Sequence, residues 1–118
     1  MKKVLICDDS LLIRRQLRDY LEEKRKDVEV IEATNGVEAL KMYRDEHPAL
    51  VLMDIVMPEM DGLGCLQEIR RYDPEAKVVV LSSVGNRETL RQALEAGAVD
   101  FIQKPWNETL INKVIDLY

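Results

Sequence analysis

The chain has 118 residues, enough for one domain with its own hydrophobic core and too few for two. Hydrophobic residues make up 47% of it and charged residues 33%, a composition typical of a folded domain with a charged surface. The formal net charge of −5 excludes the basic surface that direct binding to nucleic acid requires, and it disfavours an anionic membrane as a partner.

Five short apolar runs alternate with five helical patterns along the chain. The runs predicted to be strands are residues 4–7, 28–31, 50–53, 78–81 and 99–103. The first helix is predicted over residues 11–24, where Ile13, Leu17 and Leu21 recur at four-residue spacing. The apolar residues of the later helices are Val37, Leu40 and Tyr43, then Leu63, Leu66 and Ile69, then Leu90, Ala93 and Leu94, and finally Leu110, Ile111, Val114 and Ile115.

Several helix ends have residues typical of caps. Asn35 and Glu38 can cap the second helix reciprocally. Asn86 is predicted to cap the fourth helix and Asn107 to start the fifth. Gly97 is expected to end the fourth helix in a left-handed conformation.

The alternation of strand and helix with short connections predicts a parallel sheet. Residues 50–53 are wholly apolar, as expected for a strand that is covered on both faces. We therefore expect one α/β domain over residues 1–118, a doubly wound (βα)5 fold of the flavodoxin-like kind with a five-stranded parallel sheet and helices on both faces.

The start of the chain and its cysteines bear on location. The apolar run at residues 4–7 is too short for a signal peptide, and two acids end it. Cys7 and Cys65 both lie in apolar patterns, which favours buried thiols in a reducing compartment. We expect a cytoplasmic protein.

Polar side chains follow four of the five predicted strands. Asp8 and Asp9 end the first strand, Asp54 the third, Ser82 the fourth and Lys104 the fifth. Because the carboxyl ends of parallel strands meet at one edge of a sheet, where ligands bind, we expect these side chains to lie close together. Ser83 is an alternative to Ser82, but Ser82 comes first after the strand.

Three clustered carboxylates repel one another unless a cation neutralises them. Oxygen ligands without His or Cys select Mg²⁺, with Mn²⁺ or Ca²⁺ as alternatives. Lys104 adds a second cation that could contact a phosphoryl oxygen, and Ser82 adds a hydroxyl donor. A carboxylate nucleophile, a metal and a lysine are the groups that phosphoryl transfer needs, so Asp54 is a candidate for an aspartyl phosphate.

Four motifs occur in this order: Val4-Leu5-Ile6-Cys7-Asp8-Asp9-Ser10, then Leu52-Met53-Asp54-Ile55-Val56-Met57-Pro58-Glu59-Met60-Asp61-Gly62, then Leu81-Ser82-Ser83, and Gly97-Ala98-Val99-Asp100-Phe101-Ile102-Gln103-Lys104-Pro105. With these motifs the chain resembles the response-regulator receiver domain, the CheY-like family, over essentially its whole length. An acid pair alone is a weak signal, whereas the four motifs together at this spacing are a strong one.

The resemblance implies a role for each matching residue. Asp54 looks like the phosphoacceptor, which takes a phosphoryl group from a sensor histidine kinase, a phosphotransfer protein or a small phosphodonor. Asp9 looks like a direct Mg²⁺ ligand and Asp8 like a ligand through water, with Asp54 and the backbone carbonyl of Val56 completing the protein ligands. Lys104 resembles the invariant lysine of the family.

The resemblance also implies a switch. Ser82 is similar to the switch hydroxyl and Phe101 to the switch aromatic, which together would alter a face formed by the fourth helix, the fifth strand and the fifth helix. A downstream protein is expected to bind that face, and the chain is expected to be a monomer or a weak phosphorylation-dependent dimer. Pro105 suggests a cis peptide bond. Apolar Val56 and Val84 stand where the family controls phosphoryl lifetime, which predicts slow self-dephosphorylation.

Other functions fit less well. Aspartate-based phosphatases need a nucleophile and an acid two residues apart after one strand, whereas Asp54 is solitary and Asp8 and Asp9 are adjacent. A phosphorylation-independent interaction module of the same fold is expected to lack some of the site residues, and all are present. No Gly-x-Gly-x-x-Gly motif for dinucleotides follows the first strand. We therefore expect a signalling switch that catalyses at most its own phosphorylation and dephosphorylation.

Overall fold

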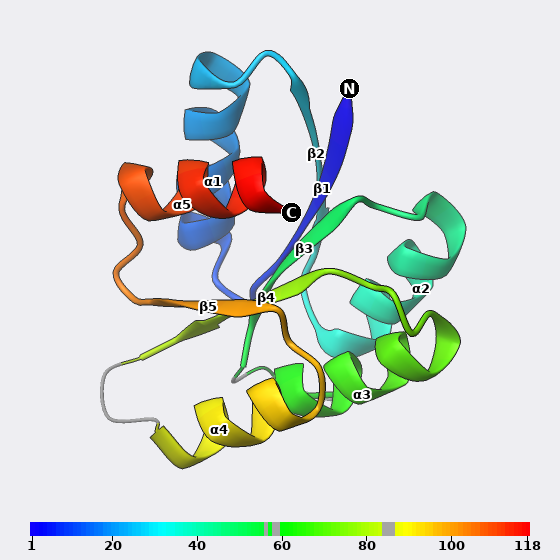
Figure 1. Cartoon of the computed structure of the whole chain (residues 1–118). Coiled ribbons are helices and arrows are strands. Elements are labelled where there is room, and N and C mark those ends of the chain that lie inside the picture. Colours follow the sequence, from blue (N-terminus) through cyan, green and yellow to red (C-terminus); the bar gives the residue numbers. More distant parts are fainter. Residues whose placement is uncertain (56, 58–59, 84–86) are drawn as a thin grey trace.

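Strands and helices alternate along the chain in the computed structural model, which describes residues 1–55, 57, 60–83 and 87–118 (Figure 1). The strands are β1 (Lys2–Cys7), β2 (Val28–Ala33), β3 (Leu50–Asp54), β4 (Val78–Ser82) and β5 (Asp100–Gln103). The helices are α1 (Leu11–Lys24), α2 (Gly36–Glu46), α3 (Gly62–Tyr72), α4 (Arg87–Glu95) and α5 (Glu108–Leu117). Each predicted strand and helix is thereby confirmed.

All five strands are parallel and lie in the order β2-β1-β3-β4-β5. The chain winds outward from β1 to β2, and then in the opposite direction from β3 to β5. The reversal falls between the adjacent strands β1 and β3, and the chain leaves their carboxyl ends toward different helices, α1 and α3. A crevice for ligands is expected at this position in an open parallel sheet.

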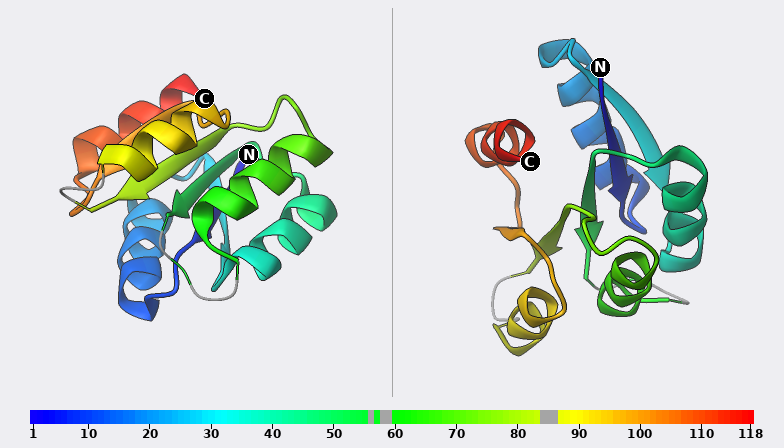
Figure 2. Two further views of the ribbon diagram at one scale, coloured as in Figure 1. Left: turned by 90° about the horizontal axis from the view of Figure 1, so that it is seen from below. Right: turned by 45° about the vertical axis from the view of Figure 1, so that its right-hand side comes forward.

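Helices cover both faces of the sheet (Figure 2). Side chains of a strand alternate between its faces. In β3, Val51 and Met53 pack in one apolar cluster with residues of α2, α3 and α4, whereas Leu50 and Leu52 pack in a second cluster with α1 and α5. The alternation explains why the whole of β3 is buried, as the apolar run predicted.

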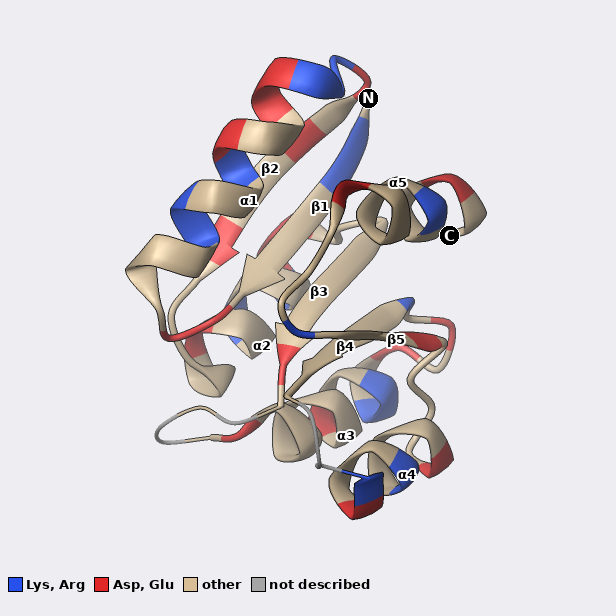
Figure 3. Cartoon of the chain, turned by 90° about the vertical axis from the view of Figure 1, so that its left-hand side faces the viewer, with Lys and Arg blue, Asp and Glu red and all other residues tan. Residues whose placement is uncertain are grey.

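Charged residues lie on the helices and connecting segments, and the central strands carry almost none (Figure 3). The exceptions visible on β1 and β3 are basic residues where β1 begins and an acidic residue where β3 ends. None of the helices within the described ranges is long and apolar enough to cross a bilayer.

Most predicted caps are present. The Glu38 amide donates to the Asn35 side chain (2.8 Å) and the Leu110 amide to the Asn107 side chain (2.9 Å). The reciprocal bond at α2 differs from the prediction, because the Glu38 carboxylate accepts from the amide of Thr34 (3.1 Å) rather than of Asn35. Gly97 has the expected positive φ, 111°. The predicted cap Asn86 lies outside the described residues.

Two of the apolar residues that mark the predicted helices are exposed. Val37 is 52% exposed and Leu94 is 42% exposed, while Ala39 and Ala93 are buried. Gly36 and Tyr43 lie on the buried face of α2, and Val37 is rotated by about 100° from Gly36 because each helical residue turns by that angle. Hydrophobicity alone misassigned these two side chains.

Candidate functional site

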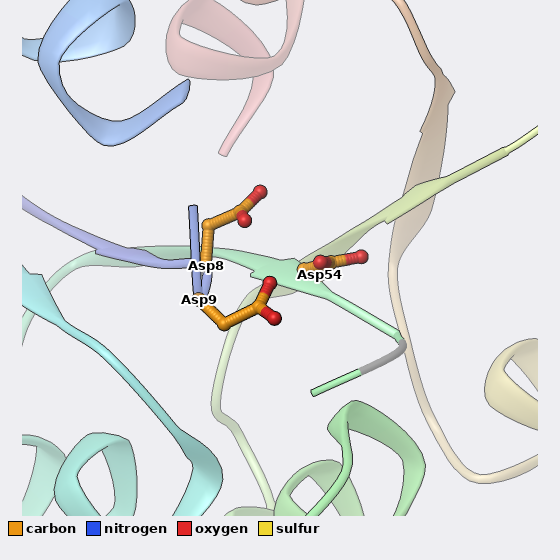
Figure 4. A group of neighbouring side chains, drawn as sticks. All are labelled: Asp8, Asp9 and Asp54. Atoms are coloured by element: carbon orange, nitrogen blue, oxygen red, sulfur yellow. The ribbon is translucent and has the colours of Figure 1, made fainter. Parts of the chain in front are cut away.

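Three carboxylates converge at the switch between β1 and β3 (Figure 4). Asp8 and Asp9 directly follow β1, and Asp54 is the last residue of β3. One carboxylate oxygen from each lies within 4.8 Å of the others. Asp8 and Asp54 are buried, whereas Asp9 is exposed. The sequence correctly predicted that these acids come together.

Lys104 joins the cluster from the end of β5. Its ammonium nitrogen lies 3.2 Å from Asp8 Oδ2 and 3.2 Å from Asp54 Oδ1. Burial of the ammonium acts to lower the pKa of Lys104, but the charges of Asp54 and Asp8 outweigh it and the pKa lies above its ordinary value. The lysine is thus held in its charged form between two carboxylates. The peptide bond from Lys104 to Pro105 is cis, as expected.

Asp8 is fixed through every polar group it has. Its amide donates to the carbonyl of Ala33 on β2 (3.3 Å), and its carboxylate accepts from the Ser10 amide (2.9 Å). Its backbone carbonyl accepts a hydrogen bond from the guanidinium of Arg14 (2.6 Å). The turn that carries the acid pair is therefore tied to β2, to α1 and to Lys104.

Sequence reasoning missed Arg14. This residue is 8% exposed, and its guanidinium also pairs with Glu32 on β2 (3.2 Å). A signal was present, because Arg14 precedes Leu17 by three residues and Leu21 by seven, which puts it on the buried face of α1. A charged residue on that face requires polar partners, which here are Glu32 and the carbonyl of Asp8.

Ser82 ends β4 and is 4% exposed. In the sheet register Asp54 pairs with Leu81, so Ser82 lies one residue beyond Asp54 on the adjacent strand. Its hydroxyl donates to the carbonyl of Ser83 (3.2 Å), and its own carbonyl accepts from the Lys104 amide (2.7 Å). The structure therefore brings Ser82 to the same edge as the three acids and Lys104.

Phe101, by contrast, turns its side chain outward. It lies on β5, directly opposite Val80 in the register, and is 42% exposed.

The segment after Asp54 is held by a glycine. The Gly62 amide donates to the carbonyl of Ile55 (2.7 Å), and a Cβ at Gly62 would lie 2.1 Å from the carbonyl oxygen of Asp54. Only glycine permits α3 to begin this close to the end of β3. The segment also contacts α2, where the Gly36 amide donates to the carbonyl of Met60 (3.0 Å).

Two predictions fall on residues outside the described ranges. The carbonyl of Val56 was predicted to bind the metal, and Val56 together with Val84 was predicted to slow loss of the phosphoryl group. Both residues lie in the undescribed positions, and both predictions stay predictions.

The two thiols are packing groups. Cys7 Sγ lies 3.3 Å from Met57 Sδ and 3.4 Å from the carbonyl oxygen of Asn35, and burial raises its pKa far above the ordinary value. Burial also raises the pKa of Cys65 to about 12. Neither thiol is activated as a nucleophile, which requires a lowered pKa.

The donor set suits a hard divalent cation. All three side-chain ligands offer carboxylate oxygens, and Mg²⁺ binds such oxygens while keeping several waters for exchange with phosphate oxygens. One oxygen from each acid lies within 4.8 Å of the others, so a single cation could contact them directly or through water. The arrangement can hold a cation beside Asp54, with the ammonium of Lys104 3.2 Å from the same carboxylate.

Comparisons with known proteins agree over nearly the whole chain. Residues 4–116 match the family described as response regulator receiver domain. The chemotaxis protein CheY of Thermotoga maritima is 40% identical over 115 residues, which cover 98% of this chain and 95% of that protein. The receiver domain of NtrX from Brucella abortus superposes with a TM-score of 0.89 at 34% identity, covering 97% of this chain and 95% of the other. A chain of the CheX–CheY–BeF₃–Mg²⁺ complex from Borrelia burgdorferi superposes with a TM-score of 0.87 at 32% identity, covering 97% and 86%.

Proposed function

The chain belongs to the response regulator receiver domain family of two-component signalling, and on this basis we propose that Asp54 accepts the phosphoryl group. The observation that carries the proposal is the convergence of Asp8, Asp9 and Asp54 with Lys104 at one edge of the sheet. The donor is a sensor histidine kinase or a phosphotransfer protein, and a small phosphodonor can replace it. The domain is itself the substrate and catalyses at most its own phosphorylation and dephosphorylation.

Mg²⁺ is the proposed cofactor, with Mn²⁺ as a substitute. Asp9 would bind it directly, Asp8 through water, and Asp54 and the Val56 carbonyl would complete the protein ligands. When bound, the ion neutralises negative charge on the transferring phosphoryl oxygens. The cluster of oxygen donors supports this choice, and the related Borrelia structure contains Mg²⁺ with BeF₃.

In the proposed reaction a carboxylate oxygen of Asp54 attacks phosphorus. A P–O bond forms to Asp54 as the P–N bond to the donor histidine breaks, and the leaving imidazole nitrogen takes up a proton. Lys104 lies 3.2 Å from this carboxylate and favours its charged form, and a carboxylate needs no base to become nucleophilic. The chain's task is to position this oxygen and to neutralise charge.

Lys104 changes partner in this proposal. Before transfer its ammonium lies 3.2 Å from both Asp54 and Asp8. Once Asp54 is esterified, its carboxyl group no longer carries that charge, and the phosphoryl group brings about 1.5 to 2 negative charges. The ammonium therefore moves its contact from the Asp54 carboxylate to a phosphoryl oxygen.

Ser82 and Phe101 form the proposed switch. The Ser82 hydroxyl turns from the carbonyl of Ser83 to a phosphoryl oxygen, and Phe101 turns inward into the space that this opens. The buried position of Ser82 and the exposed ring of Phe101 support an unphosphorylated starting state. The change alters the face of α4, β5 and α5, where a downstream protein binds. Near-complete switching needs a difference of about 5 kcal/mol between the two states.

The phosphodonor protein must dock beside the acidic edge to reach Asp54. Leu11 and Leu12, which follow the acid pair at the start of α1, are 57% and 65% exposed. Such adjacent exposed leucines can bury apolar surface against a donor. We place the reaction in the cytoplasm, which the free thiols Cys7 and Cys65 support, and expect a monomer or a weak dimer on phosphorylation.

Intact-mass measurement after incubation with acetyl phosphate and Mg²⁺ tests the function. The parent chain is expected to gain one phosphoryl group, and Asp54→Ala is expected to gain none. Asp45→Ala, which removes an exposed acid of α2, is the matched control and should be labelled like the parent. Labelling of the parent should stop when the metal is chelated.

A parent chain that gains no label, and that also fails to bind a BeF₃ mimic in the presence of Mg²⁺, would contradict the proposal. It would point to a phosphorylation-independent interaction module. The fluoride mimic excludes rapid hydrolysis as the reason for a missing label.

A further inference from the structure

Arg14 connects the acidic cluster to the edge strand of the sheet. It is a buried cation on α1, and its guanidinium has two partners that are far apart in sequence. One nitrogen donates to the backbone carbonyl of Asp8 (2.6 Å), and another donates to the carboxylate of Glu32 on β2 (3.2 Å). The planar guanidinium therefore bridges the end of β1 to β2, beyond their ladder of hydrogen bonds.

Glu32 is held in turn by a second arginine. Arg18, one helical turn after Arg14, pairs with Glu32 through its guanidinium and with Glu22 (2.6 Å). Arg14 and Arg18 thus share one carboxylate, but the described contacts of Arg18 do not include Asp8. Of the two arginines, Arg14 is the one whose described contacts reach the acid pair, whereas Arg18 is more exposed and contacts Glu22 instead.

We propose that Arg14 is a positioning residue that holds the turn at Asp8 and Asp9 in the geometry that binds Mg²⁺. The inference rests on the proposed function. Asp9 is exposed and can aim its carboxylate inward only if the backbone on either side is fixed. The Asp8 amide is held by Ala33, and the Asp8 carbonyl is the next group that could rotate. Arg14 holds that carbonyl with a charge-assisted hydrogen bond.

A lysine cannot take this role, because it presents a point charge rather than a planar fork with several fixed donors. The Arg14→Lys variant would keep the charge on α1 and the attraction to Glu32. It would not hold Glu32 and the Asp8 carbonyl at the same time. Arg14→Lys therefore separates the geometry of the guanidinium from its charge.

Arg18→Gln is the matched control. Both Arg14→Gln and Arg18→Gln remove one positive charge from the same carboxylate, so they alter the field at the acidic cluster in the same sense. Only Arg14→Gln removes the contact with Asp8. If Arg14 has a merely structural role, both variants should lose stability and neither substitution should change the affinity for Mg²⁺.

The experiment is a calorimetric Mg²⁺ titration of the full chain, together with hydrogen exchange of the Ser10 amide in metal-free protein. Removing a group that orients a metal ligand costs about 10-fold or more in affinity. We expect a loss of about 10-fold in Mg²⁺ affinity for Arg14→Gln and for Arg14→Lys, and less than about twofold for Arg18→Gln. The Ser10 amide, which donates to Asp8 Oδ1, should exchange faster only in the Arg14 variants.

Equal Mg²⁺ affinities in Arg14→Gln and Arg18→Gln would overturn the inference and leave the proposed function standing. Failure of the parent chain to bind Mg²⁺ would overturn both. If Arg14→Gln does not fold, Arg14→Lys decides by the same comparison, since it keeps the buried charge paired with Glu32.

Discussion

At the scale of single residues, Lys104 offsets part of the charge of the acidic cluster. Its ammonium lies between two of the three carboxylates and neutralises part of their repulsion. The same charge opposes the approach of a divalent cation. If the proposed Mg²⁺ site forms, Lys104 should therefore keep its affinity moderate, which suits a cation that must exchange ligands with a phosphoryl group.

Tyr43 and Asp73 form a hydrogen-bonded pair on the side of the sheet covered by α2 and α3, and it carries a prediction about acid stability. The Tyr43 hydroxyl donates to Asp73 Oδ2 (2.8 Å), which together with the Glu75 amide lowers the pKa of Asp73 below its ordinary value of 3.8. A lowered pKa in the folded state stabilises the fold above the ordinary pKa, and this contribution disappears as pH falls through the folded-state value. As pH falls below about 4, the free energy of unfolding should therefore decrease less in Tyr43→Phe than in the parent.

Urea denaturation from about pH 7 down to about pH 2 checks this difference. At neutral pH, Tyr43→Phe should be less stable by about 1 kcal/mol, because the hydrogen bond is lost. Tyr72→Phe, which alters the neighbouring ring, is the control and should follow the parent at every pH. Identical pH profiles for the parent and Tyr43→Phe would contradict the prediction.

At the scale of helices and strands, β5 joins the site to the proposed output face. Phe101 on β5 is exposed. We predict that Phe101→Ala is still phosphorylated at Asp54 but no longer shows the conformational change in α4 and α5. The reason is that alanine is too small to fill the space that Ser82 vacates. Amide chemical shifts of α4 and α5, recorded before and after phosphorylation, measure that response.

Leu117→Ala serves as the control for Phe101→Ala, because Leu117 is also exposed, at 59%, and lies on α5. It should retain shift changes like those of the parent. If Phe101→Ala shows the full set of changes as well, the aromatic side chain has no part in the switch.

The sequence predicted the elements well because their signals are local. Short runs rich in apolar residues marked the strands. The topology of a parallel sheet correctly brought together the residues just beyond these runs, Asp8, Asp54 and Lys104. The direction in which a single side chain points was less predictable. Val37 is apolar but lies outside the buried face of α2, and Arg14 is charged but lies on the buried face of α1.

Contacts between distant segments could not be predicted from local signals. The pairing of Arg14 with Glu32 depends on how α1 lies over β2, and the contact of Gly36 with Met60 depends on how α2 meets the segment before α3. Gly36 is visible in the sequence, but the reason that glycine is needed there is not. A Cβ at this position would lie 2.1 Å from the Met60 carbonyl oxygen. Such distances arise only from the assembled fold.

At the scale of the whole molecule, the concentration of acids at one edge predicts that metal binding is linked to folding. A ligand that binds only the folded state stabilises it, by about 2.7 kcal/mol when its concentration is 100 times its dissociation constant. Saturating Mg²⁺ should therefore raise the urea midpoint of the chain, because it relieves the repulsion among Asp8, Asp9 and Asp54.

Urea titrations with Mg²⁺, with a chelator, and with KCl at equal ionic strength separate binding from screening. Mg²⁺ should stabilise the parent, and KCl and the chelator should not. Asp9→Asn should lose most of the Mg²⁺ effect while Asp45→Asn keeps it. An equal effect of KCl would show that only general screening is involved.

The hydrogen bond from the Lys104 amide to the Ser82 carbonyl, 2.7 Å long, also bears on how fast the two residues can respond to a phosphoryl group. It joins the residue after β5 to the last residue of β4, so both residues that are proposed to meet the phosphoryl group start from backbones of fixed separation. Their response then requires rotation about side-chain bonds, which is faster than the collective displacement of packed elements. The lag between arrival of the phosphate and its detection would be short, and the tempo of signalling would be set by the donor and by the lifetime of the phosphate.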